Sequence, residues 1–147
     1  MTYSDKPKIT FYVLSTQLQP EREMFACKLI EKIYRSEQNC YVLTDSAEQA
    51  GSMDKQLWTF RAGSFIPHQI YKGILPDLNQ TILIGGSDIP ESRQNIIINL
   101  SSIFPTLSEQ TKRIIEILDA SETSKQAGRQ RYRHYQELGL EIETHKI

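Results

Sequence analysis

The chain has 147 residues, of which 39% are hydrophobic and 24% charged, and its formal net charge is -1 at pH 7. This length fits one domain over residues 1–147, and the composition excludes disordered and fibrous proteins. A chain so close to neutral does not bind nucleic acid through its whole surface, so any anion binding depends on a local excess of basic residues.

Short apolar runs bounded by turn signals predict strands that are buried on both faces of a parallel sheet. In chain order these runs are residues 9–14, 41–43, 81–84, 95–100 and 113–118, and a half-exposed edge strand is expected at 140–144. Helical spacing of apolar residues predicts helices at 21–36, after Ser46 and at 123–136. Strands that alternate with helices indicate an α/β fold with a mostly parallel sheet.

The ends of the helices carry their own signals. Ser46 followed by Gln49 is a capping box that opens the second helix, and Thr123 with Gln126 offers the same device for the last one. Gly139 is placed to end that last helix in a left-handed conformation. Residues 104–110 are expected to form a short helix or a turn.

A search for catalytic chemistry finds no motif. Gly85 and Gly86 follow a predicted strand, but the lysine and hydroxyl of a phosphate-binding loop are missing, so we interpret them as a turn. His68, His134 and His145 lie outside any catalytic motif or metal-ligand cluster. We therefore expect a binding module without catalytic, metal or cofactor sites.

The compartment is inferred from the cysteines and the hydropathy. Cys27 and Cys40 lack metal-ligand spacing and indicate unreactive, reduced thiols. The apolar run near the amino terminus is too short for a signal peptide, and no stretch approaches the length of a membrane span. We expect a cytoplasmic protein that does not enter a membrane.

The predicted helix at 123–136 carries four basic residues and no acid. Three of them, Lys125, Arg129 and Arg133, recur every four residues and share a face with Tyr132. Such a face suits an acidic peptide tail, a terminal carboxylate or a phosphate. The alternatives are an ordinary solvated helix face and direct binding of single-stranded nucleic acid.

A second candidate surface lies in the apolar segment from Trp58 to His68, which has no helical period. Phe65, Ile66 and Pro67 concentrate there beside a glycine. The segment either folds back over the sheet edge as core or forms an exposed patch that binds another subunit.

Several phrases resemble the chi subunits of bacterial DNA polymerase III. They are TFYVL at 10–14, SFIPH at 64–68, DIPESRQNIIINL at 88–100 and KQAGRQRYRHYQELG at 125–139. The resemblance implies a single Rossmann-like three-layer domain that lacks a phosphate-binding loop and acts as a non-catalytic accessory subunit of the polymerase. It also implies pairing with the psi subunit, and through psi a link to the clamp-loader complex. Members of this family bind the acidic C-terminal tail of single-stranded DNA-binding protein, so the resemblance implies that the chain contacts DNA only indirectly.

The resemblance assigns residues to both surfaces. The tail-binding residues would be Leu118, Lys125, Arg129, Tyr132 and Arg133, and the psi interface would be Trp58, Phe65, Ile66 and Pro67. Arg129 would hold the terminal carboxylate, Lys125 and Arg133 would attract acidic residues, and Leu118 with Tyr132 would receive the last aromatic side chain. Arg133 stands where the family often has lysine, and Gly128 is unusual in mid-helix, where it would make room for the peptide backbone. A helicase is a further candidate partner for the psi surface.

Overall fold

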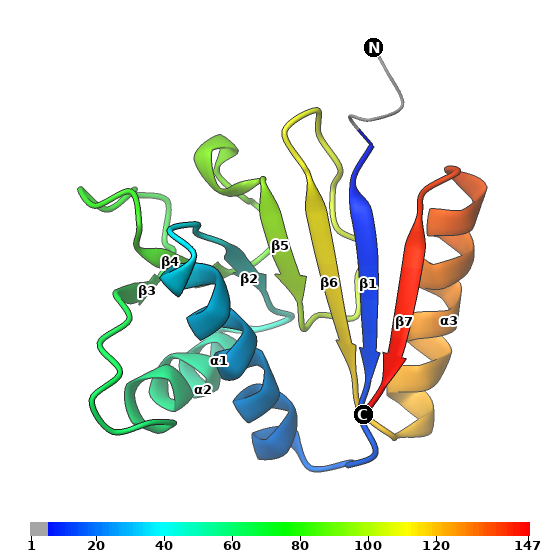
Figure 1. Ribbon diagram of the computed structural model, residues 1–147, viewed down its shortest axis with the longest axis horizontal. Helices are drawn as coiled ribbons and strands as arrows, with labels where there is room; N and C mark the ends of the chain where they lie inside the picture. Colours follow the sequence, from blue (N-terminus) through cyan, green and yellow to red (C-terminus); the bar gives the residue numbers. More distant parts are fainter. Residues whose placement is uncertain (1–5) are drawn as a thin grey trace.

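A seven-stranded sheet in the order β3-β4-β2-β5-β6-β1-β7 forms the centre of the computed structural model, which describes residues 6–147 (Figure 1). Every strand pair is parallel, which confirms and sharpens the predicted mostly parallel sheet. The strands are β1 Lys8–Val13, β2 Tyr41–Leu43, β3 His68–Ile70, β4 Ile82–Gly85, β5 Ile96–Asn99, β6 Arg113–Leu118 and β7 Ile142–Lys146. Residues 1–5, which the single-domain prediction includes, lie outside the described part.

Helices cover both faces of the sheet, so the fold has three layers (Figure 1). α1 (Gln19–Arg35) and α2 (Ala47–Thr59) pack on one face, where Ile30 and Met53 join Val42 and Ile98 in one apolar core. α3 (Glu122–Glu137) packs on the other face and contributes Tyr135 to a second core. The predicted Rossmann-like three-layer architecture is confirmed.

Loops complete the α3 face of the sheet, because a single helix cannot cover seven strands. Ile89 lies in the segment before a short 3-10 helix, η2 (Glu91–Arg93), and is buried in the second core. Phe104 and Leu107, from the segment between β5 and β6, pack against the same core. The segment predicted as a short helix or turn, 104–110, contains no helix, and its turn lies at 109–110.

The helix ends agree with the sequence at two sites and differ at a third. The Ser46 hydroxyl accepts a hydrogen bond from the Gln49 backbone N–H at 3.1 Å, as in a capping box, while the Gln49 side chain accepts from the backbone N–H of Asp45 at 2.7 Å, one residue before the cap. Gly139 has φ +74° and ends α3, as predicted. The predicted cap of α3 at Thr123 is wrong, because Ser121 accepts from the Ser124 amide at 3.2 Å and the helix begins two residues earlier than the cap prediction implied.

Gly85 is the last residue of β4, and Gly86 begins the bend that follows, so the predicted turn starts one residue later than the sequence indicated. A Cβ atom on Gly85 would lie 2.5 Å from the Tyr41 hydroxyl oxygen, so glycine is required by close packing. That hydroxyl donates to the Gly86 carbonyl at 2.6 Å. The two glycines therefore accommodate a core tyrosine at a strand end.

β3 is the one strand that the sequence analysis missed. It contains three residues after Pro67, too few to establish a period, and it pairs only with β4 at the sheet edge. β7 forms the opposite edge beside β1. Within residues 6–147, no helix is both long enough and apolar enough to cross a membrane.

Candidate functional site

A surface pocket of about 750 Å³ lies between α3 and the ends of β1, β6 and β7. We refer to it as the α3 pocket. Four of the five predicted tail-binding residues line it, namely Leu118, Lys125, Arg129 and Tyr132. Arg133, the fifth, is exposed on α3 but is not part of the lining. Strand β6 and helix α3 thus bring together residues that the sequence spread over fifteen positions.

The floor of the α3 pocket is apolar. Phe11 of β1 is buried, and its ring centroid lies 5.4 Å from that of Tyr132, tilted by 55°. Leu118 at the end of β6 is 6% exposed and belongs to the same core. The Tyr132 ring is partly buried, so an apolar side chain entering the pocket would meet a packed and rigid surface.

Gly128 permits the close approach of α3 to this floor. A Cβ atom there would collide with Cδ1 of Leu118, and Cδ2 would lie 3.0 Å away. Gly128 also lines the α3 pocket, so the suggestion that it makes room for a peptide backbone stays a prediction. Leu118 fills the space beside Gly128. This contact gives a structural reason for glycine at a helix position where it costs about 1 kcal/mol relative to alanine.

Lys125, Arg129 and Lys146 are basic residues in the lining of the pocket. In the part of the chain that the structure describes, no ion pair joins Lys125, Arg129 or Lys146 to an acid. Arg133 is also unpaired there and exposed. Unpaired guanidinium and ammonium groups beside an apolar floor suit a ligand that carries both carboxylates and an apolar side chain.

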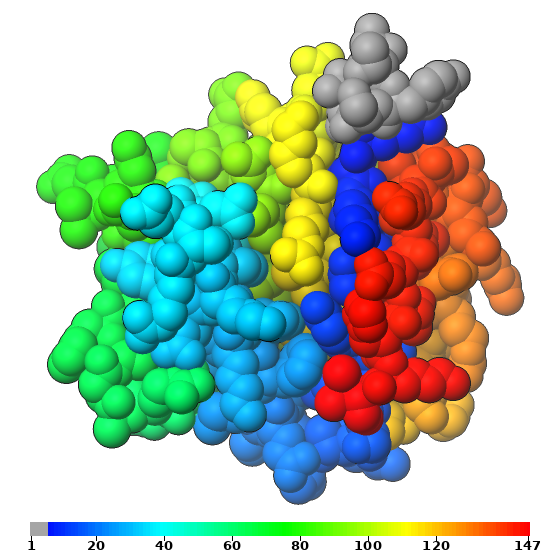
Figure 2. All heavy atoms as spheres, in the orientation of Figure 1, coloured from blue at the N-terminus to red at the C-terminus, as the bar shows by residue number. Residues whose placement is uncertain are grey.

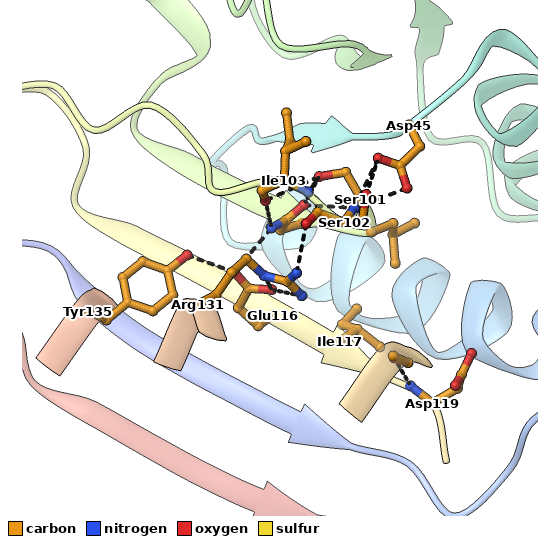
Figure 3. A network of polar contacts seen from close by, with 12 residues as sticks. Asp45, Ser101, Ser102, Ile103, Glu116, Ile117, Asp119, Arg131 and Tyr135 are labelled. Atoms are coloured by element: carbon orange, nitrogen blue, oxygen red, sulfur yellow. Dashed lines mark hydrogen bonds and ion pairs between the residues drawn. The ribbon is translucent and has the colours of Figure 1, made fainter. Parts of the chain in front are cut away.

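The fourth basic residue of α3 faces inward. Arg131 is buried, and its Nε and Nη2 atoms each lie 3.0 Å from Oε1 of Glu116, which is fully buried in β6 (Figure 3). The other carboxylate oxygen accepts from the Tyr135 hydroxyl at 2.6 Å and from Nδ2 of Asn99 at 3.1 Å. Burial, followed by the charge and hydrogen bond of Glu116, raises the pKa of Tyr135.

This buried network positions the binding face, and the sequence analysis missed it. Nη1 of Arg131 donates to the Ser102 carbonyl at 3.1 Å, so the network also fixes the segment after β5. Glu116 interrupts the apolar strand sequence RIIEIL, which is the one signal that a buried acid with a basic partner was present. With Arg131 held inward, helical geometry turns Arg129 and Arg133 toward solvent.

The aromatic patch, which we define as Trp58 and Phe65, lies on the other side of the molecule. Their side chains are 66% and 87% exposed, at the end of α2 and in the loop before β3. Ile66 was assigned to the same interface, but it is only 4% exposed and belongs to the core on the α1 and α2 face. Pro67 is partly buried.

His68 supports the aromatic patch from below. Its ring centroid lies 4.7 Å from the Trp58 ring, and its Nδ1 lies 2.7 Å from the Ile66 carbonyl oxygen. The histidine is itself buried and begins β3, so it has a structural role beneath Trp58. Because β3 and β7 are opposite edges of the sheet, the aromatic patch and the α3 pocket are well separated.

Fold and pocket together define a Rossmann-like α/β domain with a cation-bordered surface pocket. Its fold is similar to that in the crystal structure of T4 UvsW, with a TM-score of 0.70 at 10% identity, over 100% of this chain and 42% of that one.

Sequence comparisons then identify the family. The model described as DNA polymerase III chi subunit, HolC, matches residues 7–143. A relative from Pseudomonas aeruginosa, DNA polymerase III subunit chi, is 27% identical over 95% of this chain and 96% of its own length. The subunit of the same name from Escherichia coli is 25% identical over 92% of this chain and 95% of its own length. The chain belongs to the DNA polymerase III chi subunit family, and it is a replication accessory subunit of that polymerase.

Proposed function

We propose that this chain is a non-catalytic adaptor with two binding surfaces, located with the polymerase at the cytoplasmic replication fork. The α3 pocket takes the acidic C-terminal tail of single-stranded DNA-binding protein. The aromatic patch docks the psi subunit and thereby the clamp-loader complex. The observation that carries the proposal is the α3 pocket, in which Leu118 and Tyr132 form an apolar wall beside unpaired Lys125 and Arg129.

Each part of the α3 pocket has a role in this proposal. Arg129 pairs with the terminal carboxylate, since a planar guanidinium binds a carboxylate through two hydrogen bonds. The last apolar or aromatic side chain enters between Leu118 and the Tyr132 ring. Lys125 attracts an acidic residue one step upstream. Arg133, outside the pocket on the same helix, adds long-range attraction rather than a direct bond.

The expected affinity is in the micromolar range and depends on salt. The charges at the pocket rim are exposed, except for half-buried Lys125, so each rim pair contributes only about 0.2–1 kcal/mol. At physiological ionic strength the Debye length is about 8 Å, which screens the more distant cations. The apolar side chain and the terminal carboxylate must therefore supply most of the affinity.

The decisive experiment is a titration of the protein with a labelled acidic peptide that ends in phenylalanine. We expect Arg129→Ala to weaken binding about tenfold or more, because hydrogen bonds to charged groups contribute about 1.5–3 kcal/mol. Lys32→Ala, which removes an exposed charge on α1, is the matched control and should leave the affinity unchanged. Equal affinities for the Arg129 variant and the parent chain would refute the assigned site.

The psi surface is tested separately. Replacing Trp58 and Phe65 together with alanine should abolish co-elution with purified psi, while the tail peptide still binds. Leu138→Ala removes another exposed apolar side chain, at the end of α3, and serves as the control. Undiminished psi binding by the double variant would show that psi docks elsewhere. The same pair of variants asks whether a helicase uses this surface.

Direct binding of single-stranded nucleic acid by α3 is the alternative. It needs aromatic rings on which bases can stack. Tyr135 is fully buried, and the Tyr132 ring already packs against Phe11, so α3 presents few open ring faces. A single-stranded oligonucleotide that displaced the peptide at equal concentration, with a steep salt dependence, would favour this alternative.

A further inference from the structure

A second pocket of about 440 Å³ adjoins the α3 pocket. The two share Leu14, Ser15 and Ile147 and therefore lie side by side at the carboxyl end of β1, and we refer to them together as one groove. One half lies on the α3 side of the sheet, and the other half lies against the first turns of α1. Figure 2 shows the surface hollowed between the beginning of α1 and the carboxyl end of the chain.

The half beside α1, which we call the α1 pocket, also combines an apolar wall with a cation, but unlike the α3 pocket it has an acid in its lining. Met24 and Phe25 are partly buried and give it an apolar wall. Lys28 is exposed at its border and forms no ion pair with an acid among residues 6–147. Glu21 is the one acid in its lining.

From this continuity we infer that the α1 pocket holds the part of the acidic tail that precedes its last few residues. The inference rests on the proposed function, because it extends the same peptide beyond the α3 pocket. The peptide passes over Leu14 and Ile147, places an upstream apolar residue against Met24, and brings an upstream carboxylate to Lys28. Both halves of the groove thus offer an apolar wall with an unpaired cation beside it.

The chemistry of the α1 pocket favours a peptide over a nucleic-acid strand. The Phe25 ring packs against Tyr12, with ring centroids 5.1 Å apart at 60°, and is only partly open to a stacking base. Glu21 would repel a phosphate. A peptide can place an apolar residue beside Glu21 and a carboxylate beside Lys28, whereas a nucleic-acid strand carries a phosphate at every nucleotide.

Two acidic peptides with the same phenylalanine end test the inference. One has about four residues and fills only the α3 pocket, and the other has about nine, long enough to span up to roughly 30 Å when extended. We expect the long peptide to bind about threefold to tenfold more tightly than the short one. Lys28→Glu should remove that advantage and leave the short peptide unaffected. Lys32→Glu, one turn further along α1 and outside the groove, should change neither affinity.

A spin label at the amino end of the long peptide locates its path. Broadening of the amide signals of Met24, Phe25 and Lys28 in a nitrogen-15 correlation spectrum supports the inference. Broadening on the outer face of α3, or equal affinities of the two peptides, overturns it. If Lys28→Glu and Lys32→Glu weaken the long peptide equally, the effect is general charge and the inference is also wrong.

Failure of the proposed function gives a different result. In that case the short peptide does not bind, or binds equally well to Arg129→Ala, and the further inference falls with it. A different outcome is that a single-stranded oligonucleotide of matched charge displaces the long peptide from the parent chain but not from the Lys28→Glu variant. That result would assign the α1 pocket to nucleic acid, and it would overturn this inference without affecting the proposed function.

Discussion

Replacing Arg131 with methionine tests whether the buried ion pair holds α3, and with it the binding face, in place. The substitution keeps much of the apolar stem but removes two of the four donors that surround the Glu116 carboxylate, Nε and Nη2. Only the Tyr135 hydroxyl and the Asn99 amide then remain on the other oxygen. Glu116 is fully buried, so water cannot replace the lost charge.

The expected cost is large relative to the stability of the domain. Removing one partner of a buried pair typically costs about 3–5 kcal/mol, because an uncompensated charge is left in the interior. A domain unfolds with a free energy of only about 5–15 kcal/mol, so Arg131→Met should lose a substantial fraction of it. The double variant Glu116→Gln with Arg131→Met removes both charges and should recover most of the loss.

Urea denaturation followed by far-UV circular dichroism measures these differences as changes in midpoint at constant slope. Arg133→Met, two residues along the same helix but exposed, is the matched control and should change the unfolding free energy by less than about 0.5 kcal/mol. The reasoning fails if Arg131→Met costs less than about 1 kcal/mol. It also fails if the double variant is as unstable as the single one.

Three further predictions concern Gly128 and the buried thiols. Gly128→Ala should lower the affinity for the acidic peptide several-fold, because the added methyl group pushes Leu118 into the α3 pocket. The unfolding free energy of this variant should change by only about 1–2 kcal/mol, since the better helix propensity of alanine partly offsets the overpacking. Unchanged peptide affinity would contradict this prediction. Burial raises the pKa of Cys27 and of Cys40 to about 12, so neither thiol should react with a disulfide reagent at neutral pH until urea is added. Rapid reaction of the native protein would refute the assigned burial. Because the folded-state pKa is raised from 9.0, the stabilising contribution of each thiol is full below pH 9.0 and is lost as pH rises toward about 12. The urea midpoint should therefore fall less steeply above pH 9.0 in Cys40→Ala than in the parent chain. Parallel plots of midpoint against pH for the two proteins would count against the raised pKa of Cys40.

The positions of the two surfaces matter for the proposed adaptor role. The α3 pocket lies beside β1 and β7, whereas the aromatic patch precedes β3 at the opposite edge of the sheet. Separate edges allow both partners to bind one chain at once. Saturating psi should therefore leave the affinity for the tail peptide unchanged, which a titration of the preformed complex measures.

Some features of this protein follow from local sequence alone. The strands at 41–43 and 113–118 coincide with their predicted ranges, because a run buried on both faces has few alternatives to a strand. The outward face of α3 follows from helical spacing, which places Lys125, Arg129 and Arg133 together. Gly139 ends α3 because a left-handed residue is needed there and glycine adopts it without strain.

Other features depend on contacts between residues far apart in the chain. Charge type does not reveal burial, so only the packing of α3 on β6 separates inward-facing Arg131 from its solvated neighbours. The same holds for the adjacent apolar residues Phe65 and Ile66. Ile66 enters the core, whereas Phe65 stays exposed near β3 at the edge of the sheet. The sequence alone determined which side chains can bind an acidic ligand, through their chemistry and spacing. The tertiary structure decided which of them share a pocket, because that depends on which strand lies beneath the helix.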